Sequence, residues 1–325
     1  MKKGISLMIL SFFLGILWTF FSPSFVLAVY PEKPVTLICP VGPGGANDTI
    51  ARAIAESMKK YFPKPIVVVN RPGGVVTIGT AETVTAKADG YTIGTTTMSA
   101  VTIMPHQMSL PYKTPDDYTP IALVGTQSDV VAVHSDSPFK TLNDFIEYAR
   151  ANPGKLRVGS FGVGHFTHLI LEQLKSQAQI DVTNVFSKSG GEQVALLLGK
   201  HVDAQVLTVL EILPHVQGGK AKVLAVCDER RSAIFPEVPT FKESGYDITL
   251  TTYTLLIGPK ELPPDVLSKL QEAYKKVSQD PNFVQLMERQ GFTVLYEGTE
   301  ELRKRLWKDY NANKGVLERL GEKKK

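Results

Sequence analysis

Residues 35–52 read VTLICPVGPGGANDTIAR, the pattern of a strand, a glycine turn and the start of a helix. The first five residues are apolar apart from one threonine, as in a buried parallel strand. Three glycines then leave backbone amides uncovered by side chains, and Asn47 or Asp48 is expected to cap the helix that follows. Bare amides at a helix N-terminus favour an anion, and a small carboxylate fits that geometry.

Two familiar phosphate motifs do not match this turn. A dinucleotide fingerprint needs a third glycine where Asn47 stands. A P-loop needs a lysine directly after the glycine turn, but the first lysine after Gly45 is Lys59. Asp48 is expected to cap the helix or brace the loop rather than act as a catalytic acid. For this stretch taken alone, a turn that serves packing only stays an open alternative.

The first 28 residues have the pattern of a secretion signal. Lys2 and Lys3 precede an almost wholly apolar run over residues 5–21, and a small-residue cleavage site ends at Ala28. The alternative is an uncleaved membrane anchor, which the serines and proline before Ala28 disfavour. Removal of this segment takes away two lysines and no acid, so the formal net charge falls from +4 to +2. We therefore expect an exported protein with no nucleic-acid partner.

Cys39 and Cys227 are the only cysteines, and each lies inside an apolar, strand-like run. We expect two buried free thiols, with a single disulfide as the alternative in an exported protein. Neither cysteine lies near Ala28, which argues against a lipid anchor at the cleavage site.

Strand-like and helix-like segments alternate along most of the chain. This alternation predicts mainly parallel sheets flanked by helices, with enough material for two α/β lobes. Glycine turns fall at the ends of strands, where open α/β sheets bind ligands. Residues 121–133 and 250–259 are expected to cross between the lobes as hinges. The other expected strands include residues 65–70, 91–97, 156–160, 182–186, 204–207 and 222–227, and the expected helices include residues 78–86, 142–151, 168–177 and 192–198.

An ordered set of short motifs runs from Tyr30 to at least Gly291. It includes PVGPGG at 40–45, NRPG at 70–73, DGYT at 89–92, SGG at 189–191, GKHVD at 199–203 and PEVPT at 236–240. One short glycine motif is weak evidence, whereas an ordered set over most of the chain is specific. The set resembles the solute-binding receptors of tripartite tricarboxylate transporters, the Bug-type proteins.

The resemblance implies a type II-like periplasmic-binding-protein fold, whose two lobes close over a ligand. Lobe 1 would comprise residues 29–122 and 255–325, and lobe 2 residues 123–254. The ligand would be a small organic carboxylate, delivered to the subunits of a membrane permease. Neither catalysis nor a metal or cofactor is expected, and the protein is expected to be a monomer.

In this family the ligand carboxylate is held mainly by backbone amides and small hydroxyls. Leu207 stands where some relatives place an acid that binds a ligand amine, so a plain carboxylate is expected rather than an amino acid. Phe161 and Phe166 either cover an apolar part of the ligand or pack in the core. The resemblance assigns ligand binding to Gly44, Gly45, Ala46, Asn47, Thr96 and Thr97 in lobe 1, and to Gly164, His165, Phe166, Thr167, Ser189, Gly190, Leu207 and Thr208 in lobe 2.

Two local patterns suggest other chemistry. His165 and His168 have a spacing that suits a metal on a helix face, but further ligands at metal-binding spacing are missing. A serine-hydrolase elbow needs a glycine two residues before Ser160, where Val158 stands. A secreted hydrolase is kept as a minor alternative, and a ligand-sensing module for a membrane kinase as the main rival to transport.

Overall fold

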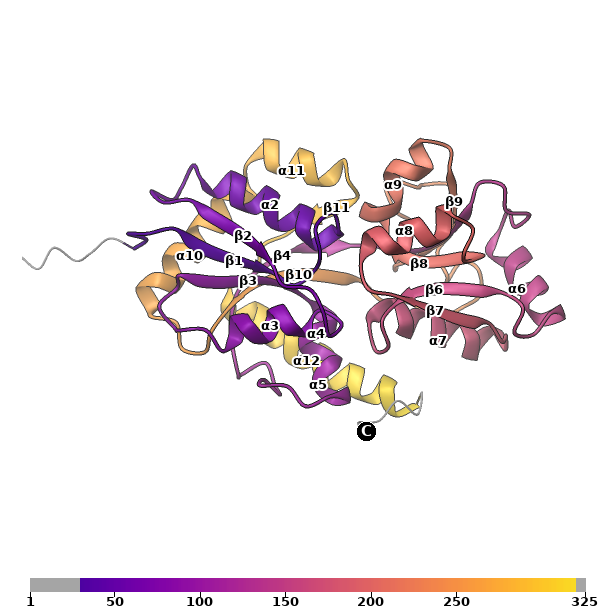
Figure 1. Cartoon of the computed structure of the whole chain (residues 1–325), viewed down its shortest axis with the longest axis horizontal. Helices are drawn as coiled ribbons and strands as arrows, with labels where there is room; N and C mark the ends of the chain where they lie inside the picture. The colour runs from indigo at the N-terminus through magenta and orange to yellow at the C-terminus, as the bar shows by residue number, and fades with distance from the viewer. Residues whose placement is uncertain (1–29, 320–325) are drawn as a thin grey trace, which may run out of the picture.

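The computed structural model describes residues 30–319, which form two lobes side by side (Figure 1). Each lobe is built on one sheet with helices on both faces, so the two-lobed α/β fold expected from the sequence is confirmed. The expected secretion signal, residues 1–28, lies outside the described residues. Within residues 30–319, no helix is long and apolar enough to cross a membrane.

The sheet of lobe 1 has six strands in the order β11-β4-β10-β3-β1-β2. Helices α2, α10 and α11 cover one face, and α3, α4, α5 and α12 lie on the other (Figure 1). The strands are β1 Val35–Cys39, β2 Ile66–Asn70, β3 Thr92–Thr97, β4 Thr119–Gln127, β10 Thr252–Gly258 and β11 Phe292–Val294. The helices are α2 Ala46–Met58, α3 Thr77–Val84, α4 Met98–Thr102, α5 Met104–Gln107, α10 Pro264–Ser278, α11 Pro281–Glu288 and α12 Thr299–Arg319.

The sheet of lobe 2 has five strands in the order β7-β6-β8-β5-β9. Helices α8 and α9 lie on one face, and α6 and α7 lie on the other (Figure 1). The strands are β5 Asp129–His134, β6 Arg157–Phe161, β7 Thr183–Ser187, β8 Ala204–Thr208 and β9 Ala221–Cys227. The helices are α6 Leu142–Ala151, α7 Phe166–Ala178, α8 Gly190–Leu198 and α9 Val209–Gln217.

Strand direction corrects one expectation, because both sheets are mixed rather than mainly parallel. β1 runs parallel to β2 and β3, and β6 runs parallel to β7 and β8. β10 is antiparallel to β3 and β4, and β5 is antiparallel to β8 and β9. Both β5 and β10 begin where the chain arrives from the other lobe, so they run against strands that end at the cleft.

The chain crosses between the two sheets at Ser128, between the end of β4 and the start of β5. It returns just before Thr252, where β10 begins. The lobe boundaries expected from the sequence, 122/123 and 254/255, therefore fall inside β4 and β10, a few residues from the crossings.

Asp228 ties the two crossings together. Its carboxylate accepts hydrogen bonds from Ser128 Oγ at 2.9 Å and from Thr251 Oγ1 at 3.1 Å. Next to this pair, Thr252 Oγ1 donates to Asp129 Oδ2 at 3.1 Å. Short polar side chains at the two crossings thus hold both hinge strands in place.

Cys39 and Cys227 are both free and buried, as the apolar runs around them predicted. Cys39 ends β1 in the core between the lobe 1 sheet and α2, whereas Cys227 ends β9 in a core that continues through lobe 2. The alternative of a single disulfide is not what the structure shows.

Candidate functional site

A small cavity of about 40 Å3 lies between the lobes, where helices of both lobes begin. Residues of both lobes line it, so it exists only when the lobes meet. The residues expected from the sequence that line it are Gly45, Ala46, Asn47, Thr97, His165, Phe166, Thr167, Gly190 and Thr208.

The N-cap residues of two lobe 1 helices, Val76 of α3 and Thr97 of α4, line the cavity. Four further helix N-termini belong to α2, α7, α8 and α9. Their N-cap residues are Gly45, His165, Ser189 and Thr208 respectively, and each helix follows the end of a strand of its sheet. A helix N-terminus presents backbone N–H donors and the positive end of the helix dipole. Four such ends around one cavity make it a favourable place for a negative charge.

The turn before α2 is braced by Asp48. Its carboxylate accepts hydrogen bonds from the Gly44 amide at 3.0 Å, Arg52 Nε at 3.0 Å and Asn70 Nδ2 at 2.8 Å. Burial alone raises the pKa of Asp48, but these hydrogen bonds and the Arg52 charge outweigh it and hold the pKa below its usual value. The expectation of a side-chain cap is wrong, because the N-cap is Gly45 and Asp48 lies inside the first helical turn.

Asn47 lines the cavity from the first turn of α2 and is 4% exposed. Its Oδ1 accepts hydrogen bonds from Thr95 Oγ1 and Cys39 Sγ, whereas its amide nitrogen has no partner within the described residues. Gln127, at the end of β4, lines the same cavity, and its Oε1 is also without a partner there. The cavity therefore offers one buried donor and one buried acceptor to a ligand.

An aromatic cluster forms the lobe 2 side of the cavity. The ring of His165 lies 4.6 Å from that of Phe161 and 3.8 Å from that of Phe166, measured between centroids. His165 Nδ1 lies 3.1 Å from Thr167 Oγ1, and the same hydroxyl accepts from the Phe161 amide. Burial and the neighbouring His168 lower the pKa of His165 to about 3, so this imidazole is neutral at physiological pH.

The turn before α7 fixes the positions of the two histidines. His165 is the N-cap residue of α7, and His168 lies within the helix. His168 Nδ1 accepts a hydrogen bond from the Gly164 amide at 3.1 Å. This bond stabilises the glycine turn, in which Gly164 has a left-handed backbone with φ of +81°.

Five expected residues do not line the cavity. Thr96 Oγ1 lies 2.7 Å from Thr80 Oγ1 and ties β3 to α3. Leu207 is fully buried in the lobe 2 core, and Ser189 caps α8 with its hydroxyl. Thr96, Leu207 and Ser189 therefore stabilise the elements around the cavity and do not line it. The five are Gly44, Thr96, Gly164, Ser189 and Leu207.

Glu211 is the main lining residue that the sequence reasoning missed. It lies in the first turn of α9, and its carboxylate accepts from the Thr208 hydroxyl at 3.0 Å and the Thr208 amide at 3.3 Å. It lines the cavity together with Ala46 of lobe 1. The Thr-x-x-Glu spacing of a capping box was the signal that could have located it. Val41, Val76, Gln127 and Gln193 were also missed.

The lobes touch on either side of the cavity. A Cβ built at Gly162 in lobe 2 would lie 2.8 Å from Val75 Cγ2 in lobe 1, and one at Gly164 would lie 1.7 Å from Gln107 Oε1. Val75 and Val76 both have left-handed backbone, with φ of +54° and +74°. That conformation is an outlier for β-branched residues, and Val76 lines the cavity directly.

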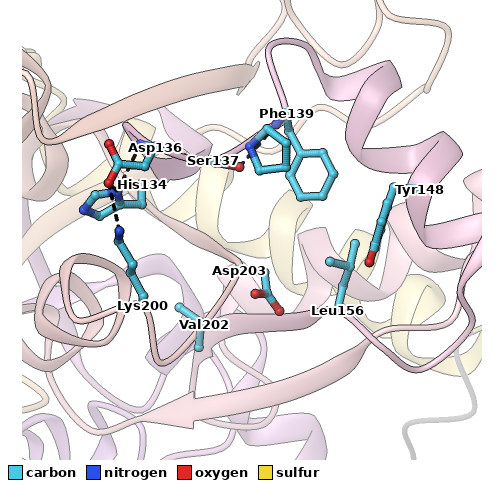
Figure 2. A pocket seen from close by; sticks show the side chains of 10 residues that line it. His134, Asp136, Ser137, Phe139, Tyr148, Leu156, Lys200, Val202 and Asp203 are labelled. Carbon is cyan, nitrogen blue, oxygen red and sulfur yellow. Dashed lines mark hydrogen bonds and ion pairs between the residues drawn. The ribbon is translucent and has the colours of Figure 1, made fainter.

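Larger cavities lie away from the helix N-termini. Figure 2 shows one of about 310 Å3 at the far end of lobe 2, with Phe139 and Tyr148 opposite Asp136. Asp136 Oδ2 lies 2.8 Å from Lys200 Nζ and 3.7 Å from His134 Nδ1, so Asp136 and Lys200 form an ion pair beside this cavity. Another, of about 950 Å3, opens along the hinge and is lined by exposed charged side chains. By size alone, these larger cavities would be the better candidates for a ligand site. The hydrogen-bond donors, however, converge on the cavity between the lobes.

Ser160 does not have the surroundings of a hydrolase nucleophile. It is fully buried, and its hydroxyl donates to Asn184 Oδ1 at 2.9 Å rather than to an imidazole. Its place is inside β6, one residue before the strand ends.

Two α/β lobes, joined by two strand crossings and enclosing a cavity rich in helix N-termini, define the class of two-lobed solute-binding proteins. The chain belongs to the tripartite tricarboxylate transporter family of receptors, whose family model matches residues 50–321. It is 30% identical over 292 residues to the UPF0065 protein in the gbd 5'region of Cupriavidus necator, covering 90% of this chain and 89% of that protein. This family consists of periplasmic substrate-binding receptors.

Solved structures agree with this assignment. The periplasmic binding protein BugD superposes with a TM-score of 0.87 at 27% identity, covering 91% of this chain and 100% of that one. A Rhodopseudomonas palustris protein solved with adipate, R. palustris Rpa4515, gives a TM-score of 0.86 at 21% identity, with 90% and 98% covered. The second likeness shows the fold alone.

Proposed function

We propose that this protein captures a small organic carboxylate between its lobes and delivers it to a tripartite tricarboxylate-type permease. The observation that carries the proposal is the convergence of four helix N-termini on one cavity shared by both lobes. Donors and dipoles fixed by the backbone favour a negative charge without a permanent countercharge. Such a site releases its ligand when the lobes part, as delivery requires.

The finer parts of the proposal follow from the family and the sequence. Residues 1–28 would direct export and be removed, and the mature protein would act as a periplasmic monomer. A protein of the same fold holds adipate, which supports a carboxylate ligand for this architecture. The ligand contacts would come from Gly45, Ala46, Asn47, Thr97, His165, Phe166, Thr167, Gly190 and Thr208.

Calorimetric titration of the mature protein against acetate, succinate, adipate and citrate tests the proposal. We expect one-to-one binding of at least one of them, and absence of binding by all four contradicts the proposed ligand class. Ligand binding also stabilises the folded state, so a thermal shift should accompany every calorimetric hit.

Gly45→Val gives a matched test of the lobe 1 contact. A Cβ at Gly45 lies only 3.3 Å from Val41 Cγ2, so valine would crowd the α2 N-terminus and is expected to lower affinity at least tenfold. Gly42→Ala is the control, because nothing lies within 4 Å of a Cβ there. Equal affinity of the valine variant and the control would remove the α2 N-terminus from the site.

A further inference from the structure

Two buried amide side chains of lobe 1 line the cavity between the lobes, and each has one atom without a hydrogen-bond partner. They are Asn47 in the first turn of α2, 4% exposed, and Gln127 at the end of β4, 6% exposed. Among the partnerless buried side-chain atoms of the residues that the structure describes, only Asn47 Nδ2 and Gln127 Oε1 belong to residues that line this cavity. A buried polar atom without a partner costs folding free energy, so its presence in a cavity wall indicates a ligand group that pairs with it.

Contacts within lobe 1 decide which end of the Asn47 amide is left over. Asn47 Oδ1 accepts a hydrogen bond from Thr95 Oγ1 and lies 3.7 Å from Cys39 Sγ. Burial raises the pKa of Cys39 to about 11, so Cys39 is a protonated thiol that donates to this oxygen. The amide nitrogen of Asn47 is therefore the free end, and it can only donate a hydrogen bond.

The strand register places Gln127 on the same face of the lobe 1 sheet as Asn47. Gln127 is paired with Thr252 on β10, and Thr254, two residues further along β10, is paired with Thr97 on β3. Directly paired residues of antiparallel strands share a face, as do residues two apart in one strand, so Gln127 and Thr97 lie on one face. Asn47 is hydrogen-bonded to the side chain two residues before Thr97, which lies on that face too. Both amides thus reach the cavity from one face of one sheet.

A hydroxyl is the ligand group that matches this pair of amides. Asn47 Nδ2 needs an acceptor and Gln127 Oε1 needs a donor, and a hydroxyl is both. A carboxylate only accepts and an ammonium only donates, so neither satisfies both side chains. The positive ends of the helices around the cavity disfavour an ammonium further.

We propose that the ligand is a hydroxycarboxylate, whose carboxylate lies at the helix N-termini while its hydroxyl accepts from Asn47 Nδ2 and donates to Gln127 Oε1. This inference rests on the proposed function, because it adds a second polar group to the carboxylate ligand proposed there. Gln127 is then the residue that sets specificity, since an acid without the hydroxyl leaves its buried oxygen unpaired. Such an acid should bind about 10- to 100-fold more weakly than its hydroxylated counterpart.

Matched pairs of acids test the inference in the mature protein. Calorimetric titration compares succinate with each enantiomer of malate, tricarballylate with citrate, and aspartate with malate. In malate and citrate the hydroxyl is α to one carboxylate and β to another, so both spacings are covered. We expect the hydroxy acid of at least one pair to bind about 10- to 100-fold more tightly than the acid that lacks the hydroxyl.

The other outcomes separate the inference from the proposed function. If the parent acids bind as tightly as their hydroxylated counterparts, the inference is overturned and the proposed function stands. Tighter binding of aspartate than of malate would assign the second group as an ammonium and also overturn the inference. If none of these acids binds, the carboxylate ligand itself fails.

Substitutions at Gln127 assign the preference to this residue. Gln127→Met has a similar size and no amide oxygen, so the preference for the hydroxy acid should fall below about threefold. Gln127→Glu keeps an oxygen that accepts a hydrogen bond and should therefore keep the preference. Gln205→Met is the control, because Gln205 Oε1 is also buried without a partner within the described residues but Gln205 does not line the cavity. A preference that survives in Gln127→Met, or that is lost in Gln205→Met, would overturn the assignment.

Discussion

His165 shows how burial decides the state of a single residue in this site. Its imidazole lies between two phenylalanine rings and precedes α7, so it fills the cavity wall as a neutral, apolar group. The sequence showed a histidine at a helix start but not the rings around it, since Phe161 lies on the preceding strand. Charge at such a position is therefore a property of packing rather than of residue type.

The low pKa of His165 makes the folded protein sensitive to acid. Its usual pKa is about 6.5, so below that pH the unfolded chain binds a proton that the folded chain does not. Stability is fully present above about pH 6.5 and should fall by up to about 1.4 kcal/mol per pH unit towards pH 3 on this account. Urea unfolding at pH 8, 6 and 5 measures this slope.

His165→Asn provides the comparison for that slope. Asparagine is a good helix N-cap, so the variant should fold, and it has no proton to gain in this range. We expect a shallower loss of unfolding free energy between pH 8 and 5 than in the wild type. Identical slopes in the two proteins would mean that His165 is already charged in the folded state.

At the scale of elements, the turn that leads from β2 into α3 is the most strained connection. Gly73, Gly74, Val75 and Val76 all have positive φ, which is strained for the two valines, so the surrounding contacts must hold them there. Val75 lies against Gly162 of lobe 2, and Val76 lines the cavity. Strain in this turn thus lies where the two lobes meet.

Val75→Asn should relieve part of this strain. Asparagine tolerates left-handed backbone, whereas the left-handed region costs other residues about 1–2 kcal/mol, so we expect the free energy of unfolding to rise by about 1 kcal/mol. Val67→Asn is the matched control in β2, where asparagine is a poor strand residue and stability should fall by up to about 1 kcal/mol. A loss at both positions, measured by urea unfolding, would show that Val75 is not strained.

The elements were predicted far better than the contacts between them. Periodicity located β2, β3, α6 and β9 to within a residue or two, because each segment has a clear apolar pattern and a turn at its end. No helix was expected over α9, whose Pro214 suggests a break, and Glu211 was lost with it. Strand direction was also missed, since alternation of strands and helices does not report which strands cross the hinge.

The whole molecule works through the fit of its two lobes. Seven separate segments line the cavity and come together only when the sheets are placed side by side. The sequence predicted five of these segments and missed the two at Val76 and Gln127. Thr96 and Leu207 illustrate the limit, because each is adjacent in sequence to a lining residue and points into a core instead. We therefore expect ligand affinity to depend on closure of the lobes.

Gly162→Ala should act as a wedge between the lobes. The new methyl would lie 2.8 Å from Val75 Cγ2, while the backbone of Gly162 is not left-handed and accepts alanine without strain. We expect about tenfold weaker carboxylate binding, equivalent to about 1.4 kcal/mol, and a larger radius of gyration in small-angle scattering with ligand present.

Restoring the space should restore the binding. Val75→Ala removes the methyl groups that the wedge meets, so the double variant should regain most of the lost affinity. Gly191→Ala is the control, because nothing lies within 4 Å of a Cβ there. A double variant as weak as the single one would place the effect outside the lobe contact.

Helix N-termini reach the cavity from both lobes. α7, α8 and α9 belong to lobe 2, whereas α2, α3 and α4, with the N-cap residues Gly45, Val76 and Thr97, belong to lobe 1. Each lobe alone would therefore give an anion only part of the electrostatic field at the cavity. We expect the first contact of an anion with one open lobe to be weak and to strengthen as the second lobe meets it.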